Sequence, residues 1–167
     1  MTRTVPAATT AATAATRDGS QEKAEELCGA GPPANGAPRI RTLVVDDSSA
    51  FLDLLEHEVR RGLPRLEVVG RGNDGISAME LVELTAPDLV LLDLQMPGMT
   101  GFEVLRVLRE RAPVPKVVVL TSHRGSFYRE ACERLGGDGF VHKGDLMSQL
   151  APEVERLFGR PGDSTHS

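Results

Sequence analysis

Residues with chemically useful side chains stand at the ends of several short apolar runs in this chain. Asp46 and Asp47 follow one run, Asp93 ends another, and Thr121 and Lys143 end two more. If these runs are neighbouring strands of a parallel sheet, their carboxyl ends meet at one edge and the three carboxylates converge. Like charges this close need neutralisation. Mg²⁺ is the cation that fits, because the residues offer oxygen ligands and neither cysteine nor histidine.

A carboxylate, a divalent cation, a lysine and a hydroxyl together make a site for a phosphoryl group. Asp93 can act as a nucleophile and form an acyl phosphate. The cation and Lys143 would neutralise charge on the transferred group, and the Thr121 hydroxyl would hydrogen-bond one of its oxygens. The sequence has no Gly-x-x-x-x-Gly-Lys loop, so nucleotide hydrolysis lacks its usual phosphate-binding part.

The elements that position these residues are indicated by the hydrophobic pattern from Arg39 onward. Strands are expected over residues 40–45, 66–69, 88–93, 116–120 and 139–142. Helices alternate with the strands and begin at or after Ser48, Asp74, Thr100, Arg124 and Leu146. This alternation implies a parallel sheet with right-handed crossovers, and the chain is too short for an eight-stranded barrel. The predicted fold is α/β: a five-stranded, doubly wound parallel sheet, (βα)5 flavodoxin-like, with strand order 2-1-3-4-5.

Two helix starts carry further local signals. Thr100 and Glu103 have the spacing of a capping box, and Asp46 with Asp47 could equally serve as an N-terminal cap pair. His123 and His142, which flank the expected site, are expected to face solvent.

Composition argues against several classes of function. The 167 residues include 19 basic and 24 acidic side chains, a net charge of −5, which predicts neither direct nucleic-acid binding nor membrane binding. No apolar run approaches the roughly 18 residues of a membrane span. The two cysteines have no pairing or metal-ligand spacing, which argues against a disulfide scaffold and favours a cytoplasmic location.

The chain divides near Pro38. Residues 1–38 are rich in Ala, Thr, Pro and Gly and are interpreted as a disordered N-terminal extension, whose role as a tether, a docking segment or a misassigned start is left open. Residues 39–158 are the expected domain, and residues 159–167 are a disordered tail. High usage of Arg, Ala and Gly is typical of a GC-rich bacterial genome.

Five motifs occur in order at the predicted strand ends and helix starts. They are Leu43–Ser48 (LVVDDS), Leu91–Gly98 (LLDLQMPG), Thr100–Val104 (TGFEV), Val118–Ser122 (VVLTS) and Gly139–Lys143 (GFVHK). Together they resemble the receiver domain of two-component response regulators, over about residues 39–158. Each motif alone is weakly specific, but five in the right order make the resemblance strong.

The resemblance implies a role for each site residue. Asp93 would be the phosphoacceptor. Asp47, Asp93 and the backbone carbonyl of Gln95 would ligate Mg²⁺ directly, and Asp46 mostly through water. Thr121 and Lys143 would contact the phosphoryl group. A sensor histidine kinase or phosphotransfer protein would supply that group, and the domain would catalyse only its own phosphorylation and slow dephosphorylation rather than act as an enzyme.

The resemblance also implies a switch. Phosphorylation would draw Thr121 inward, Phe140 would follow, and the surface of the fourth helix, fifth strand and fifth helix would change. Because only nine residues follow Phe158, a single-domain, chemotaxis-regulator-like layout is expected. Its output would be a partner protein on that surface or a phosphorelay, and the protein would be a monomer or a phosphorylation-dependent dimer.

Two departures from the family pattern keep other readings open. Gly144 follows Lys143, where many receivers have a proline joined through a cis peptide, and the switch aromatic is Phe140 rather than Tyr. Phe140 could be simple core. The alternative function is a phosphorylation-independent interaction module with a receiver fold. An aspartyl-phosphate phosphatase is disfavoured because Gln95, two residues beyond the nucleophile, cannot act as a general acid.

Overall fold

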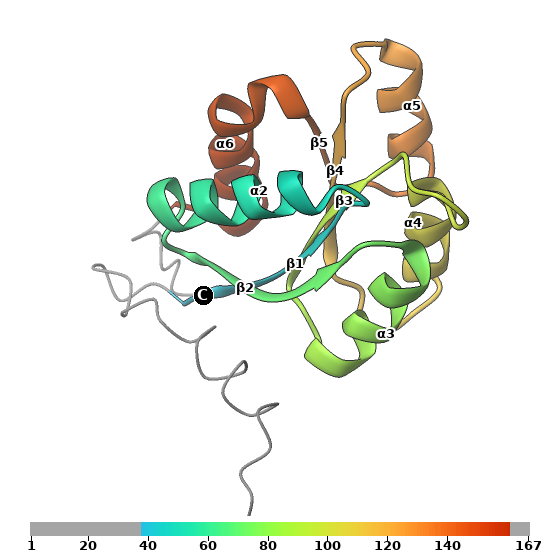
Figure 1. Ribbon diagram of the computed structural model, residues 1–167, viewed down its shortest axis with the longest axis horizontal. Coiled ribbons are helices and arrows are strands. Elements are labelled where there is room, and N and C mark those ends of the chain that lie inside the picture. Colours follow the sequence, from blue (N-terminus) through green and yellow to red (C-terminus); the bar gives the residue numbers. More distant parts are fainter. Residues whose placement is uncertain (1–37, 161–167) are drawn as a thin grey trace, which may run out of the picture.

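Five parallel strands alternate with five α-helices in the computed structural model, which describes residues 38–160 (Figure 1). The strands are β1 (Ile40–Val45), β2 (Leu66–Gly72), β3 (Leu89–Asp93), β4 (Lys116–Thr121) and β5 (Gly139–His142). The helices are α2 (Ser49–Gly62), α3 (Gly75–Thr85), α4 (Gly101–Arg109), α5 (Ser126–Arg134) and α6 (Leu146–Phe158), with a short 3-10 helix η2 (Lys143–Asp145) before α6. The strand order is β2-β1-β3-β4-β5, which confirms the predicted doubly wound fold.

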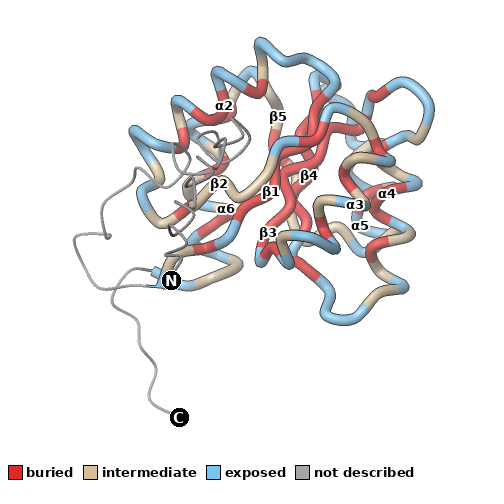
Figure 2. Tube along the Cα trace, turned by 60° about the horizontal axis from the view of Figure 1, so that its bottom comes forward, coloured by how far each residue is buried: buried red, intermediate tan, exposed pale blue. Residues whose placement is uncertain are grey.

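Alternate strand residues face two separate hydrophobic layers. Val44 and Leu91 pack in the layer covered by α2 and α6, whereas Leu43 and Val90 pack in the layer covered by α3, α4 and α5. All of β3 is buried, because helices cover both of its faces (Figure 2). A strand of this kind reads as a continuous apolar run, which is why the pattern predicted it well.

The predicted helix starts at Ser48, Asp74 and Thr100 are confirmed. Ser48 caps α2 with its side chain, and both later helices begin with a capping box, Asp74 with Ser77 and Thr100 with Glu103. Each cap satisfies backbone N–H groups that the first turn of a helix leaves without partners. The helix starts are therefore encoded locally.

β3 begins and β4 ends one residue later than predicted, and two boundaries differ by more. β2 continues to Gly72 because its last residues still pair with β1, where Val45 lies opposite Gly72. Glycine weakens the strand signal, which hid this extension. Helix α5 begins at Ser126 rather than Arg124, and its cap residue Gly125 makes no side-chain cap hydrogen bond. Residues 122–125 therefore form a loop at the carboxyl end of β4.

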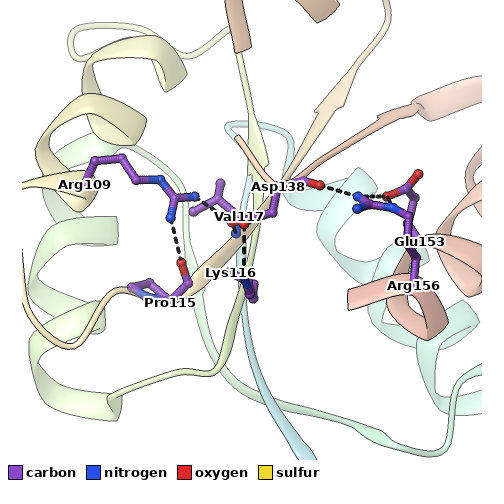
Figure 3. Close-up of polar contacts among 7 residues, drawn as sticks. All are labelled: Arg109, Pro115, Lys116, Val117, Asp138, Glu153 and Arg156. Atoms are coloured by element: carbon purple, nitrogen blue, oxygen red, sulfur yellow. Dashed lines mark hydrogen bonds and ion pairs between the residues drawn. The ribbon is translucent and has the colours of Figure 1, made fainter. Parts of the chain in front are cut away.

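Asp138 is the centre of a hydrogen-bonded network at the amino-terminal ends of the strands, which form the amino edge of the sheet (Figure 3). Its carboxylate accepts hydrogen bonds from Arg109 at the end of α4 (2.7 Å) and from the backbone N–H of Val117 (2.8 Å), and it pairs with Lys116 (3.3 Å). The Arg156 guanidinium of α6 donates to its backbone carbonyl. The network joins helices from both layers to the start of β4 and β5.

No helix within residues 38–160 is both long and apolar enough to cross a membrane. The predictions of disorder for residues 1–38 and 159–167 fall almost entirely outside the described residues and stay predictions.

Candidate functional site

Four of the predicted site residues meet at the carboxyl edge of the sheet. Asp46 directly follows β1, Asp93 ends β3, Thr121 ends β4 and Lys143 directly follows β5. Because β1, β3, β4 and β5 are consecutive neighbours in the sheet, these four residues lie at adjacent strand ends. The expectation that topology would bring them together is met by the observed strand order.

The aspartates form one compact cluster. Asp46, Asp47 and Asp93 each offer a carboxylate oxygen, and these oxygens lie within 4.8 Å of one another. Asp46 is completely buried and Asp93 is 3% exposed, whereas Asp47 is open to solvent. Three carboxylates without a cysteine or histidine are a donor set that suits a hard cation such as Mg²⁺, and the exposed Asp47 leaves room for water ligands.

Lys143 supplies the positive charge at this site. Its Nζ donates to Oδ2 of Asp46 and lies 3.3 Å from Oδ1 of Asp93. The same nitrogen lies 4.4 Å from the centroid of the Phe51 ring. This cation–π contact also holds the Lys143 side chain in place. The lysine side chain is only 17% exposed. One largely buried cation therefore faces two buried carboxylates.

The positive charge of Lys143 does not fully balance the negative charges of Asp93 and Asp46. Burial raises the pKa of the Asp93 carboxyl above its ordinary value, Lys143 opposes this shift, and the charge of Asp46 adds to it. The backbone N–H of Gln95 also hydrogen-bonds Asp93 and favours the ionised form. A divalent cation among the three carboxylates would supply the missing positive charge.

Thr121 and Gln95 lie at the same end of the sheet as the acids, and only Gln95 has a direct contact with Asp93. Thr121 is completely buried, and its Oγ1 accepts a hydrogen bond from the backbone N–H of His123 (3.1 Å). Its hydroxyl hydrogen is still available for donation, because a hydroxyl can donate and accept at once. The Gln95 side chain is exposed, so its backbone rather than its side chain faces Asp93.

Phe140 lies apart from the acid cluster, on β5. It is half-buried against the layer of α3, α4 and α5, and the Arg129 guanidinium lies 5.0 Å from its ring centroid. Two surface hollows of about 270 and 210 Å³ share Arg129 and Phe140 as lining residues.

The peptide after Lys143 is trans. Among residues 38–160, the only cis peptide joins Ala112 and Pro113. Lys143 begins the 3-10 helix η2, and its Nζ still reaches Asp46 and Asp93. The departure from Lys-Pro therefore leaves the lysine at the site.

A Gly-x-Gly-x-x-Gly spacing runs from Gly70 to Gly75 at the β2–α3 junction, and the sequence-based prediction overlooked it. β2 is an edge strand, and Oδ1 of Asp74 already accepts the Ser77 N–H (2.8 Å) at the start of α3. A Cβ on Gly75 would lie 2.6 Å from the Cβ of Met99, so this glycine permits close packing. A carboxylate where a pyrophosphate would bind argues against a dinucleotide site.

The prediction that both flanking histidines face solvent is wrong. The His123 ring stacks on Tyr128, with centroids 4.5 Å apart and planes inclined by 10°. The His142 side chain is 15% exposed and contacts the backbone of Ser122 and of Gly144. No sequence signal marks these contacts, because they depend on how two loops meet.

Comparisons with known proteins agree with this geometry. The sequence profile of the response regulator receiver domain matches residues 42–155. A protein-glutamate methylesterase/protein-glutamine glutaminase of Pyrococcus horikoshii is 44% identical over 81 residues, which is 48% of this chain and 22% of that protein. The transcriptional regulatory protein DegU of Brevibacillus brevis is 35% identical over 128 residues, 77% of this chain and 53% of that protein. The chain thus matches only part of the length of these relatives.

Solved structures give the same result. The response regulator domain of Thermotoga maritima CheB superposes with a TM-score of 0.60 at 29% identity, covering 71% of this chain and 92% of that one. A two-component response regulator of the LuxR family from Aurantimonas superposes with a TM-score of 0.67 at 28% identity, covering 71% and 84%. With the profile match over residues 42–155, these likenesses show that the chain belongs to the receiver-domain family of response regulators.

Proposed function

We propose that this receiver domain is a phosphorylation-driven switch in which Asp93 accepts a phosphoryl group from a histidine kinase or phosphotransfer protein. The observation that carries the proposal is the position of Lys143 Nζ, 3.3 Å from Oδ1 of Asp93 and bonded to Asp46 within a three-carboxylate cluster. A largely buried lysine among carboxylates can neutralise an incoming phosphoryl group as well as the acid that accepts it.

The chemistry is a transfer between two nucleophiles. An ionised oxygen of Asp93 attacks the phosphorus of a phosphohistidine, the new P–O bond forms as the P–N bond breaks, and the imidazole leaves with the electron pair and is neutralised by a proton. Lys143 stabilises the negative oxygens of the transferred group, and the Thr121 hydroxyl donates to one of them. Water later attacks the acyl phosphate, which releases inorganic phosphate and regenerates the carboxylate.

The proposed cation site consists of Asp47, Asp93 and the backbone carbonyl of Gln95, with Asp46 acting mostly through water. When bound, Mg²⁺ supplies positive charge to the phosphoryl oxygens. Both carboxylate oxygens of Asp46 already accept hydrogen bonds, Oδ1 from the Ser48 N–H (2.9 Å) and Oδ2 from Lys143, which supports a less direct role for Asp46 than for Asp47.

Signal output is proposed to run from Thr121 through Phe140 to the surface of α5, β5 and α6. The half-buried ring of Phe140 and the two hollows beside it support a rotation between two packings. The partner would be another protein bound on this surface or a phosphorelay component. Relatives named as transcriptional regulators and as methylesterases illustrate that outputs differ within the family.

Other parts of the proposal concern the whole protein. We take residues 39–158 as the receiver unit, and the disorder of residues 1–38 and 159–167 stays a prediction. The stand-alone layout, the cytoplasmic location and the choice between a monomer and a phosphorylation-dependent dimer stay predictions.

The decisive experiment is intact-protein mass spectrometry after incubation with Mg²⁺ and acetyl phosphate. We expect one added phosphoryl group that hydroxylamine removes, and none in Asp93→Asn or after magnesium chelation. A histidine kinase that transfers phosphate to the wild type but not to Asp93→Asn would support the same conclusion. If neither donor phosphorylates the protein, and a partner binds wild type and Asp93→Asn equally, the phosphorylation-independent interaction module replaces the switch.

A further inference from the structure

The peptide after Lys143 provides a hydrogen-bond donor that a proline would lack. The N–H of Gly144 points to Nδ1 of His142 at 3.1 Å. A backbone N–H can only donate, so Nδ1 accepts and the ring proton lies on Nε2. Nε2 is 3.0 Å from the carbonyl oxygen of Ser122 and donates to it. The imidazole therefore connects two backbone groups, and its Nδ1 also lies 3.5 Å from Oδ2 of Asp145, beyond its distance to the Gly144 nitrogen.

These two backbone groups belong to the loops that carry the phosphoryl-binding side chains. Ser122 directly follows Thr121, and Gly144 directly follows Lys143. The same loops are joined a second time by an ion pair between Arg124 and Asp145 (3.4 Å). The loop after β4 and the loop after β5 are thus linked by two side-chain contacts.

The residues around His142 accommodate this hydrogen-bonded bridge between the two loops. A Cβ on Gly144 would lie 3.0 Å from both Cε1 and Nδ1 of His142, so a residue without a side chain allows the ring to approach. The backbone N–H of His142 donates to Oε1 of Gln149 on α6 (3.1 Å), which fixes the end of β5. Lys143 has the helical conformation of η2, and a proline at the next position would disfavour that conformation.

We propose that His142, held by the N–H of Gly144, is a positioning residue that fixes Lys143 relative to Thr121 for phosphoryl transfer to Asp93. This inference rests on the proposed function. It gives Gly144 a role, because its N–H, which a proline would lack, holds the imidazole that bridges the two loops.

Three variants test the bridge. His142→Phe keeps a ring of similar size but loses both hydrogen bonds, and we expect phosphorylation by acetyl phosphate to slow roughly tenfold. His142→Gln keeps a donor at the position of Nε2 and should recover most of the rate, to within about threefold of wild type. Gly144→Pro makes the sequence more typical of the family, yet removes the donor and disfavours the conformation of Lys143. It should slow the reaction at least as much as His142→Phe.

Controls separate positioning from general damage. His57→Phe places the same change at an exposed position on α2 and should leave the rate unchanged. A positioning role also predicts unchanged Mg²⁺ affinity in His142→Phe, measured by amide chemical shifts of the acid cluster, because none of its proposed ligands contacts the imidazole. Nitrogen NMR of the His142 ring should show the proton on Nε2.

The outcomes distinguish the two levels of inference. If wild type is not phosphorylated by acetyl phosphate or a kinase, the proposed function fails. If wild type is phosphorylated while Gly144→Pro and His142→Phe react at the wild-type rate, or if the ring proton lies on Nδ1, only the positioning role is overturned.

Discussion

Asp93 and Asp138 lie at opposite edges of the same sheet and have opposite surroundings. The Asp138 carboxylate is met by the Val117 N–H (2.8 Å), by Arg109 (2.7 Å) and by Lys116 (3.3 Å) (Figure 3). Burial alone would raise its pKa, but these three donors together lower it below the ordinary value. The Asp138 carboxylate therefore has a full set of hydrogen-bond donors, and its charge stabilises the amino edge of the sheet.

Asp93 has fewer donors and more like charge around it. Burial raises the pKa of its carboxyl, Lys143 only partly opposes this shift, and Asp46 is a second buried acid that shares the same lysine. A buried carboxylate that lacks positive charge is poised to bind a cation and an electrophile. The Asp93 side chain is also more deeply buried than that of Asp138, 4% against 16% exposed. Deeper burial and fewer donors together separate the candidate reactive acid from the structural one.

The largest difference should come from replacing each acid by its amide. Asp93→Asn should abolish phosphoryl transfer, because the nucleophilic oxygen is lost. Its metal-free stability should rise, since one of two mutually repelling buried carboxylates is removed. Mass spectrometry and urea unfolding with chelator measure the two effects. A clearly less stable Asp93→Asn protein would contradict the inference that the negative charge of Asp93 is only partly balanced.

Asp138→Asn should show the reverse pattern. The amide can still accept from Val117 but loses its charge-assisted bonds, so the free energy of unfolding should fall by about 2 kcal/mol. Phosphorylation of Asp93 in the folded protein should persist. The matched control is Asp53→Asn, which removes an exposed partner of Arg71 and should cost less than about 1 kcal/mol. Equal losses in the two variants would show that the Asp138 network is no stronger than a surface pair.

Magnesium should stabilise the protein through the carboxyl edge alone. At a Mg²⁺ concentration tenfold above the dissociation constant, the free energy of unfolding should rise by about 1.4 kcal/mol. The increase should persist in Asp138→Asn and shrink strongly in Asp93→Asn, because only the latter loses a proposed ligand. Thermal unfolding with and without chelator measures it. An equal increase in both variants would place the bound ion elsewhere.

The two acids also differ in how far sequence could identify them. Asp93 ends an apolar strand within a recognisable motif, and parallel topology alone brings it to Asp46 and Lys143. The order of strands and motifs along the sequence was therefore enough to identify Asp93 as a site residue. Asp138 has partners 21 and 29 residues away, at Val117 and Arg109. Nothing local in the sequence marks such a contact, because it depends on how α4 packs against the sheet.

The histidine bridge marks a second limit of sequence reasoning. Gly144 could be identified as a departure from the family pattern, but its meaning depends on the ring of His142 lying over it. Side-chain hydrogen bonds between loops are set by the tertiary fold, whereas strand and helix starts at Ser48 or Thr100 are set by neighbours in sequence. The fold and the acid cluster were therefore predictable, and the groups that orient them were not.

The smallest expected effect is the pH dependence of stability without metal. Asp138 has a lowered pKa in the folded state, so its contribution is present above its unfolded value, near 3.8, and is lost as pH falls through the folded value. Asp93 has a raised folded pKa, so it destabilises the fold progressively as pH rises from near 3.8 through its folded value. The two acids therefore act with opposite slopes.

Urea unfolding in chelator from about pH 2.5 to 7 can separate these slopes. The stability difference between wild type and Asp138→Asn should be greatest at neutral pH and disappear in acid. The gain from Asp93→Asn should likewise be full at neutral pH and vanish in acid, where wild-type Asp93 is protonated in both the folded and the unfolded state. Saturating Mg²⁺ should reverse the second difference, since it stabilises ionised Asp93, and leave the first unchanged. If Mg²⁺ altered both differences alike, the two edges of the sheet would not be independent, and the contrast between a structural and a reactive aspartate would fail.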